Sequence, residues 1–141
     1  MANSILVPLD GSEKAFDALE YAVTEHGDAA ITVLHALDYW EAGPDEGTVI
    51  RMDEGVKEAA ENRAQKIFEE AEELASDLGY DGELETISRE GKPSKVIVDH
   101  SSEYDTVVMG TYGRKGMGQK LLGSVAEKVV RRSPSNVVVV K

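Results

Sequence analysis

Residues 5–12 read Ile5-Leu6-Val7-Pro8-Leu9-Asp10-Gly11-Ser12, and this apolar run ending in a polar turn decides the fold. An uninterrupted run of branched apolar residues is typical of a strand that is buried on both faces. Apolar residues then recur at helical spacing from Ala15 to Val23, and the following Gly27 is a helix stop. Either Ser12 or Asp10 can cap that helix. The segment therefore predicts a buried strand, a tight turn and an amphipathic helix.

The same alternation continues along the chain. Because continuously apolar strands alternate with amphipathic helices, the expected class is α/β: one doubly wound, Rossmann-like domain over residues 1–141. Its five-stranded parallel sheet is expected to be covered by helices on both faces. A Gly/Pro/acid stretch, Glu41–Gly47, is predicted to be a mobile loop. Further strands are predicted at Ile31–Leu37, Glu83–Arg89, Thr106–Met109 and Val137–Val140, and helices at about Met52–Leu78, from Pro93, and at Ser124–Arg132.

Composition excludes several classes of protein. The 141 residues carry 27 acidic and 15 basic side chains, a formal net charge of −12, which argues against a nucleic-acid binder held by bulk positive charge. The absence of cysteine excludes disulfides, thiolate catalysis and cysteine-ligated metals. The start has no basic segment followed by a long apolar run, so we expect neither a signal peptide nor a membrane partner, and a cytoplasmic location.

The charge is unevenly distributed. Residues 1–105 hold 26 acidic and 8 basic side chains, whereas residues 106–141 hold 1 and 7. The acidity is consistent with an ordinary solvated surface, or with an adaptation that keeps the protein hydrated in high salt. We favour the second interpretation, a source in a halophilic archaeon, as a hypothesis.

The basic region contains a glycine-rich loop, Gly110–Ser124, directly after the fourth predicted strand. Successive backbone N–H groups in such a loop can surround an anion, and the loop leads into a helix whose N-terminus favours negative charge. Ser124 is the expected N-cap, with Glu127 completing a capping box. The alternative is that the glycines only make a flexible connection, but the loop's charge and its place after a core strand favour phosphate binding.

Asp10 ends the first strand, so it is expected to face the same crevice. A carboxylate there can bind ribose hydroxyls or approach a divalent ion on a phosphate, or it can serve only as a turn residue. The loop is not a Walker A motif, because Gly-x4-Gly-Lys-(Ser/Thr) is absent, and Gly116-x-Gly118 lacks the rest of the dinucleotide fingerprint.

The spacing Gly110-x2-Gly113-x9-Gly123-Ser124 resembles the nucleotide motif of the ATP-binding branch of the universal stress protein (UspA-like) family. The opening strand, Leu34–Asp38 and Ser133–Val140 are also similar to that family, so the resemblance covers essentially the whole chain. It implies an adenine nucleotide alpha hydrolase-like fold that binds ATP, AMP or ADP, with Mg carried by the nucleotide and Asp10 near that metal. The implied nucleotide-binding residues are Pro8, Leu9, Asp10, Ala36, Met109, Gly110, Gly113, Gly123, Ser124 and Val125.

Other candidate residues carry weaker signals. Arg114, Lys115 and Lys120 are added to the phosphate site from their charge alone, and the role of Tyr112 is open. The histidines, His26, His35 and His100, show no metal-ligand spacing. Tyr39 and Trp40 follow the second strand, where stacking on adenine competes with simple packing.

The sequence leaves three functions open. The first is an ATP-binding switch or sensor in a stress response, favoured because only Asp10 is placed by a motif to assist phosphoryl transfer. The second is an enzyme, such as a slow Mg-dependent ATP hydrolase. The third is a nucleotide-free interaction module. The chain closes on Val137–Val140, and a four-valine edge strand, like the resemblance, suggests a homodimer, whereas a central strand would suggest a monomer.

Overall fold

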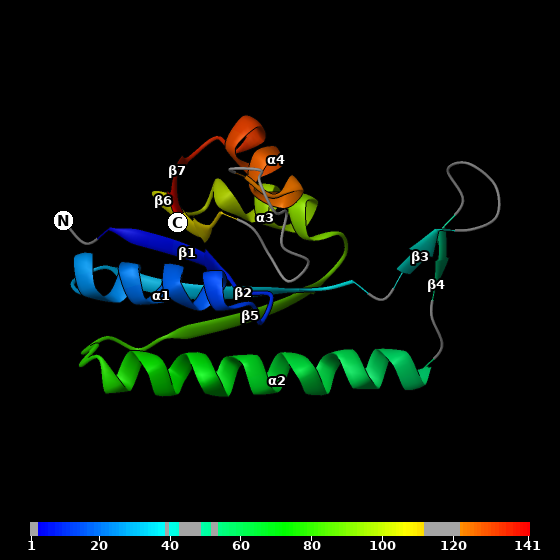
Figure 1. The fold of residues 1–141 in the computed structure, drawn as a ribbon, viewed down its shortest axis with the longest axis horizontal. Coiled ribbons are helices and arrows are strands. Elements are labelled where there is room, and N and C mark those ends of the chain that lie inside the picture. The colour runs from blue at the N-terminus through cyan, green and yellow to red at the C-terminus, as the bar shows by residue number, and fades with distance from the viewer. Residues whose placement is uncertain (1–2, 39, 43–48, 52–53, 112–121) are drawn as a thin grey trace.

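The computed structural model describes residues 3–38, 40–42, 49–51, 54–111 and 122–141, and Figure 1 shows their arrangement. The predicted elements are present, with boundaries that differ by a few residues. The elements are β1 (Ser4–Pro8), α1 (Glu13–Glu25), β2 (Ala30–Leu37), β3 (Trp40–Ala42), β4 (Val49–Arg51), α2 (Glu54–Asp77), β5 (Glu85–Glu90), α3 (Pro93–Ser101), β6 (Thr106–Gly110), α4 (Ser124–Arg132) and β7 (Asn136–Val140).

The main sheet has five parallel strands in the order β5-β2-β1-β6-β7, which confirms the predicted class. The chain moves outward from β1 through β2 to β5, then returns across the sheet to β6 on the other side of β1. The strand order therefore reverses between β1 and β6, the position at which open α/β sheets bind their ligands. Among the described strands, β7 pairs with β6 alone, so it is an edge strand.

Helices cover both faces of the sheet, as Figure 1 shows for α1 and α2 on one face and α3 and α4 on the other. Alternate residues of β1 contact opposite layers, because successive side chains of a strand point to opposite faces. Ile5 and Val7 belong to the core that includes Leu19 and Ile67, whereas Leu6 belongs to the core with Val129. Both faces are apolar, which explains the uninterrupted apolar run in the sequence.

Helix α2 is the longest element and extends past the sheet at its N-terminal end (Figure 1). Its buried positions lie between Ala64 and Ala75, while Val56 near its start is 36% exposed. After the helix, the Tyr80 hydroxyl donates to Ala29 O at 2.8 Å and accepts from Ile31 N at 3.1 Å. These bonds attach the end of α2 to the start of β2.

The predicted loop at Glu41–Gly47 needs correction. Strands β3 and β4 form an antiparallel pair in which Trp40 is opposite Arg51 and Ala42 is opposite Val49. Residues 43–48 lie outside the described residues. Val49 and Ile50 are β-branched residues, which favour a strand. The sequence prediction missed this strand because the preceding stretch is rich in glycine, proline and acidic residues.

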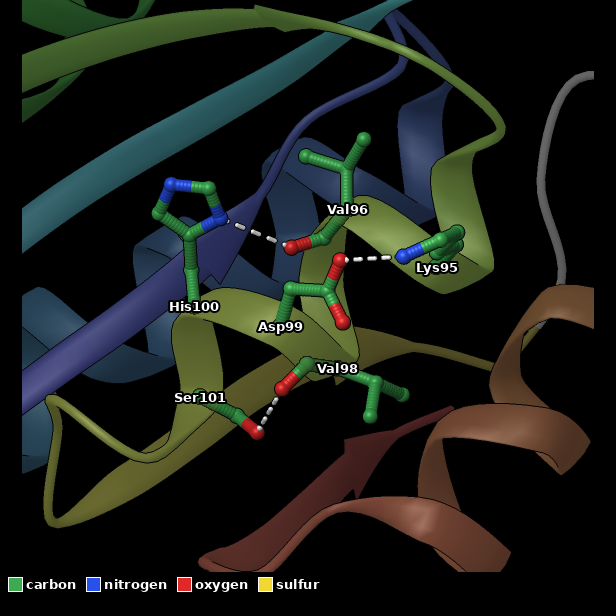
Figure 2. A network of polar contacts seen from close by, with 6 residues as sticks. All are labelled: Lys95, Val96, Val98, Asp99, His100 and Ser101. Atoms are coloured by element: carbon green, nitrogen blue, oxygen red, sulfur yellow. Dashed lines mark hydrogen bonds and ion pairs between the residues drawn. The ribbon is translucent and has the colours of Figure 1, made fainter.

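Polar side chains of α3 interact mainly within the helix itself (Figure 2). Pro93 is the first helical residue, as predicted, and Lys95 Nζ lies 2.7 Å from Asp99 Oδ2. His100 Nδ1 is 2.9 Å from Val96 O, and Ser101 Oγ donates to Val98 O at 2.8 Å. Across the part of the chain that the structure describes, no helix is long and apolar enough to cross a bilayer, and no three potential metal ligands lie together.

Candidate functional site

A cavity of about 600 Å³ opens at the carboxyl ends of the parallel strands. Its walls come from the ends of β1, β2 and β6 and from the first turns of α1, α3 and α4, with a contribution from α2. It therefore lies at the reversal of strand order, where the topology predicts a ligand. The volume is within the range of about 300–1,000 Å³ that is usual for small-molecule sites.

The structure brings together the residues that the sequence placed in a nucleotide site. Gly113 falls outside the described residues, as do Tyr112, Arg114, Lys115 and Lys120. The side chains of Tyr39 and Trp40 are likewise outside the description. The predicted residues that line the cavity are Pro8, Leu9, Asp10, Ala36, Met109, Gly110, Gly123, Ser124 and Val125. Their proximity is a structural fact, whereas their role in binding stays a prediction.

The turn after β1 fixes the direction of Asp10. Its Oδ1 accepts a hydrogen bond from Ser12 N at 2.9 Å, and Ser12 Oγ in turn accepts from Ala15 N at 3.2 Å. Ser12 is therefore the N-cap of α1, which decides between the two predicted caps. Gly11 between them has φ +88°, a left-handed conformation that favours glycine. The carboxylate is thus held half-buried at the cavity wall.

The start of α4 differs from the prediction. Gly123, with φ −72° and ψ 166°, is the N-cap, and its carbonyl accepts from Glu127 N at 2.9 Å. Ser124 is the first helical residue, so the predicted capping box does not form, and Glu127 instead lies 3.1 Å from Arg131. No described side chain caps this end of α4, and Ser124, Val125 and Ala126 of its first turn line the cavity. The N–H groups of a first turn have no partner within the helix and lie at the positive end of its dipole.

Two backbone hydrogen bonds hold the ends of the glycine-rich segment. Thr111 N donates to Val140 O at 3.0 Å, and Gly123 N donates to Thr111 O at 2.6 Å. Thr111 itself is buried. The residue after β6 and the residue before α4 are therefore joined to each other and to the edge strand β7.

The structure leaves no room for a side chain at Gly110. A Cβ at this position would lie 2.7 Å from Lys14 O and 2.8 Å from Lys14 C, both backbone atoms of α1. The sequence suggested that the loop's glycines let the backbone approach a ligand. For Gly110, the structure shows that the missing side chain lets β6 approach α1.

Sequence reasoning missed several residues of the cavity wall. Arg63 and Ala60 come from α2, and Ile97 comes from α3. His35 is buried beside the cavity, with Nδ1 2.7 Å from Leu9 O. Arg63 lies in the middle of a polar helix and 53 positions from its partner Asp10, so no local motif distinguishes it. Its helical spacing to Ala60 and Ile67 is the one signal that could have placed it on the inner face of α2.

Comparisons with known proteins extend over the whole chain. The family model described as the universal stress protein family matches residues 1–141. A universal stress protein from Methanocaldococcus jannaschii is 32% identical over 143 residues, which cover 97% of this chain and 81% of the relative. The solved structure of universal stress protein UspA from Lactobacillus plantarum superposes with a TM-score of 0.82 at 25% identity, covering 99% of this chain and 97% of that one.

Two more distant structures share the fold and carry a nucleotide. A universal stress protein in complex with cAMP has a TM-score of 0.70 at 23% identity and covers 99% of this chain and 97% of its own. A family member from Arabidopsis thaliana with AMP bound has a TM-score of 0.70 at 17% identity, with coverages of 99% and 91%. At such identities, the likeness establishes the fold.

Proposed function

The chain belongs to the universal stress protein family, and we propose on that basis that it binds an adenine nucleotide in the cavity at the carboxyl ends of β1, β2 and β6. The observation that carries the proposal is that Asp10, Ala36 and the start of α4 line one cavity, although they are far apart in sequence. The nucleotides named for two structural neighbours, cAMP and AMP, support the same ligand class.

We assign each part of the nucleotide to a different part of the site. We assign adenine to the end of β2 beside Ala36, the ribose to Asp10, and the phosphates to Gly113, Gly123, Ser124 and Val125. Helix α4 supports the phosphate assignment, because its first turn presents N–H groups at the positive end of the helix dipole. The mixed wall of apolar and polar residues, with Met109 and Ile97 among the apolar ones, suits a nucleoside.

We propose ATP with Mg as the working ligand. The donor set fits a metal that arrives on the phosphates better than a metal held by the protein, because no three candidate ligands gather among the described residues. Asp10 is the carboxylate that would approach it. When bound, Mg²⁺ neutralises phosphate charge. The chain's own contribution is to orient the ribose at Asp10 and the phosphates at the N-terminus of α4.

The proposed activity is a nucleotide-dependent switch or sensor in a stress response. Backbone N–H groups bind ground-state phosphates well, but binding alone does not lower a reaction barrier. Two carboxylates of the described residues, Asp10 and Asp38, line the cavity, and of these Asp10 is the one that the resemblance places beside the ribose. Slow hydrolysis is the competing activity, which a titration with ATP detects.

The experiment is to release and identify the small molecule carried by the purified protein, then to titrate the emptied protein with Mg-ATP by calorimetry. We expect an adenine nucleotide in the released fraction and one site per chain, with no turnover during the titration. Turnover of ATP would favour the enzyme. Absence of both a released nucleotide and measurable binding would leave only the nucleotide-free module.

We further propose a homodimer formed through β7. This strand lies at the edge of the described sheet, and its residues Val137–Val140 are half-buried rather than covered. An edge strand offers its outer backbone groups to a second copy of itself. Sedimentation over a wide concentration range should give twice the chain mass of 15.3 kDa. A particle of one chain mass at every concentration would contradict the dimer.

We also propose that the acidic surface suits a salt-rich cytoplasm, as in a halophilic archaeon. The exposed face of α2 carries Glu69, Glu70, Glu72 and Glu73, and these residues do not line the cavity. Salt screens the repulsion between such charges, so the midpoint of thermal unfolding should rise between low and molar potassium chloride. An unchanged or lower midpoint in molar salt would argue for an ordinary acidic surface.

A further inference from the structure

We infer that Arg63 is a positioning residue for Asp10, an inference that rests on the nucleotide site proposed above. Arg63 comes from α2, whereas Asp10 follows β1, and both line the cavity. The segments to which we assigned the nucleotide are the turn after β1, the end of β2 and the glycine-rich segment that leads into α4, and none of them contains a residue of α2. Helix α2 therefore contributes a further component to the site.

The contact between Arg63 and the turn is direct. Arg63 Nη2 donates to Asp10 O at 3.1 Å. A Cβ on Gly11 would lie 2.8 Å from the same Nη2 and 3.3 Å from Ile67 Cδ1. The guanidinium thus occupies the space that the missing side chain of Gly11 leaves, and the left-handed turn and the arginine fit each other.

These contacts hold the turn that carries the Asp10 carboxylate. The residue is held on one side by Ser12 N, which donates to Oδ1, and on the other by Arg63, which holds its carbonyl. Leu9 N, one residue earlier, donates to Leu34 O at 2.8 Å. Without Arg63, the carbonyl of Asp10 loses its link to α2, and the peptide between Asp10 and Gly11 can rotate.

The guanidinium of Arg63 also has an unfavourable feature, which a role in stabilising the fold does not explain. Its Nε is buried and meets no hydrogen-bond acceptor among the described residues. A buried donor on a charged group without a partner destabilises the folded state. An unbranched apolar side chain beside Ile67 would avoid that cost, so the arginine is better explained by the site than by the core.

The test compares Arg63→Met with Lys66→Met, a matched control that removes one positive charge from an exposed position of the same helix. Mg-ATP affinity and the thermal unfolding midpoint are measured for both, and the affinity also for Asp10→Asn and the double variant Asp10→Asn/Arg63→Met. We expect Arg63→Met to weaken binding about tenfold without lowering the midpoint. Lys66→Met should leave the affinity unchanged, and Arg63→Met should change it less than about twofold in the Asp10→Asn background.

The other outcomes each overturn the inference. Unchanged affinity in Arg63→Met would show that the turn keeps its shape alone. An equal loss in both backgrounds would show that Arg63 contacts the ligand independently of Asp10. Weaker binding with a lower midpoint, or failure to fold, would show a structural role. If the unaltered chain binds no nucleotide, the proposed function itself fails, which the first titration separates from all the other results.

Discussion

Replacing Gly123 by valine is expected to abolish most ATP binding while the protein stays folded. Gly123 is buried in the cavity wall and precedes the first turn of α4. Its φ of −72° and ψ of 166° are extended values that valine adopts without strain. We expect the β-branched side chain of valine to obstruct the approach of the phosphates to the N–H groups assigned to them. We expect a loss of affinity of about 100-fold, which corresponds to roughly 2.7 kcal/mol.

Calorimetry with Mg-ATP and thermal unfolding of the same samples measure this effect. Gly123→Ala is the graded control, since its smaller methyl group should weaken binding less than valine does. The unfolding midpoint should fall only slightly in both variants, because valine and alanine are poorer N-caps than glycine by about 1 kcal/mol at most. Unaltered ATP affinity in Gly123→Val would mean that the phosphates do not bind at this helix.

The second large effect is expected on stability, from Gly110→Ala. The added Cβ would meet the backbone of Lys14 at 2.7 Å, and backbone atoms cannot rotate away as a flexible side chain can. Helix α1 must therefore shift relative to β6. We expect a loss of about 3 kcal/mol in the free energy of unfolding, at the upper end of what overpacking costs, measured by urea unfolding followed by circular dichroism.

Gly79→Ala is the matched control. Gly79 has φ +79°, and no described atom lies within 4 Å of the place that a methyl group would take, so alanine there meets conformational strain but no neighbour. That strain costs about 1 kcal/mol. Gly110 has no positive φ, so its cost is steric alone. Equal destabilisation by the two variants would show that β6 and α1 do not approach as closely as the structure indicates.

The sequence predicted the fold well because the strands of a parallel sheet are buried on both faces. Such strands appear as continuous apolar runs, as at Ile5–Leu9 and Val137–Val140, and the helices between them carry clear periodicity. The position of the cavity followed from topology, because strand ends meet at one edge. Residues as distant as Asp10 and Gly110 could therefore be placed together from the sequence alone.

The features that the sequence did not predict depend on contacts that leave no pattern in the local sequence. The N-cap of α4 is Gly123 rather than Ser124, because the chain enters the helix from a bond to Thr111 and reaches helical geometry one residue earlier than the side chains suggest. The hairpin of β3 and β4 lies in a stretch whose composition favours a loop. Arg63 joins the site through a bond across 53 positions, which only the packing of α2 against α1 and β2 creates.

The bond from Gly123 N to Thr111 O bears on how the fold of this chain would respond to insertions and deletions. It joins the two ends of the glycine-rich segment to each other. The bond from Thr111 N to Val140 O attaches these ends to strand β7 of the sheet. The entropy lost when the two ends of a chain segment are held together depends only weakly on the number of residues in the segment. Changes in the length or sequence of the residues in between are therefore expected to leave β6, α4 and β7 in their places.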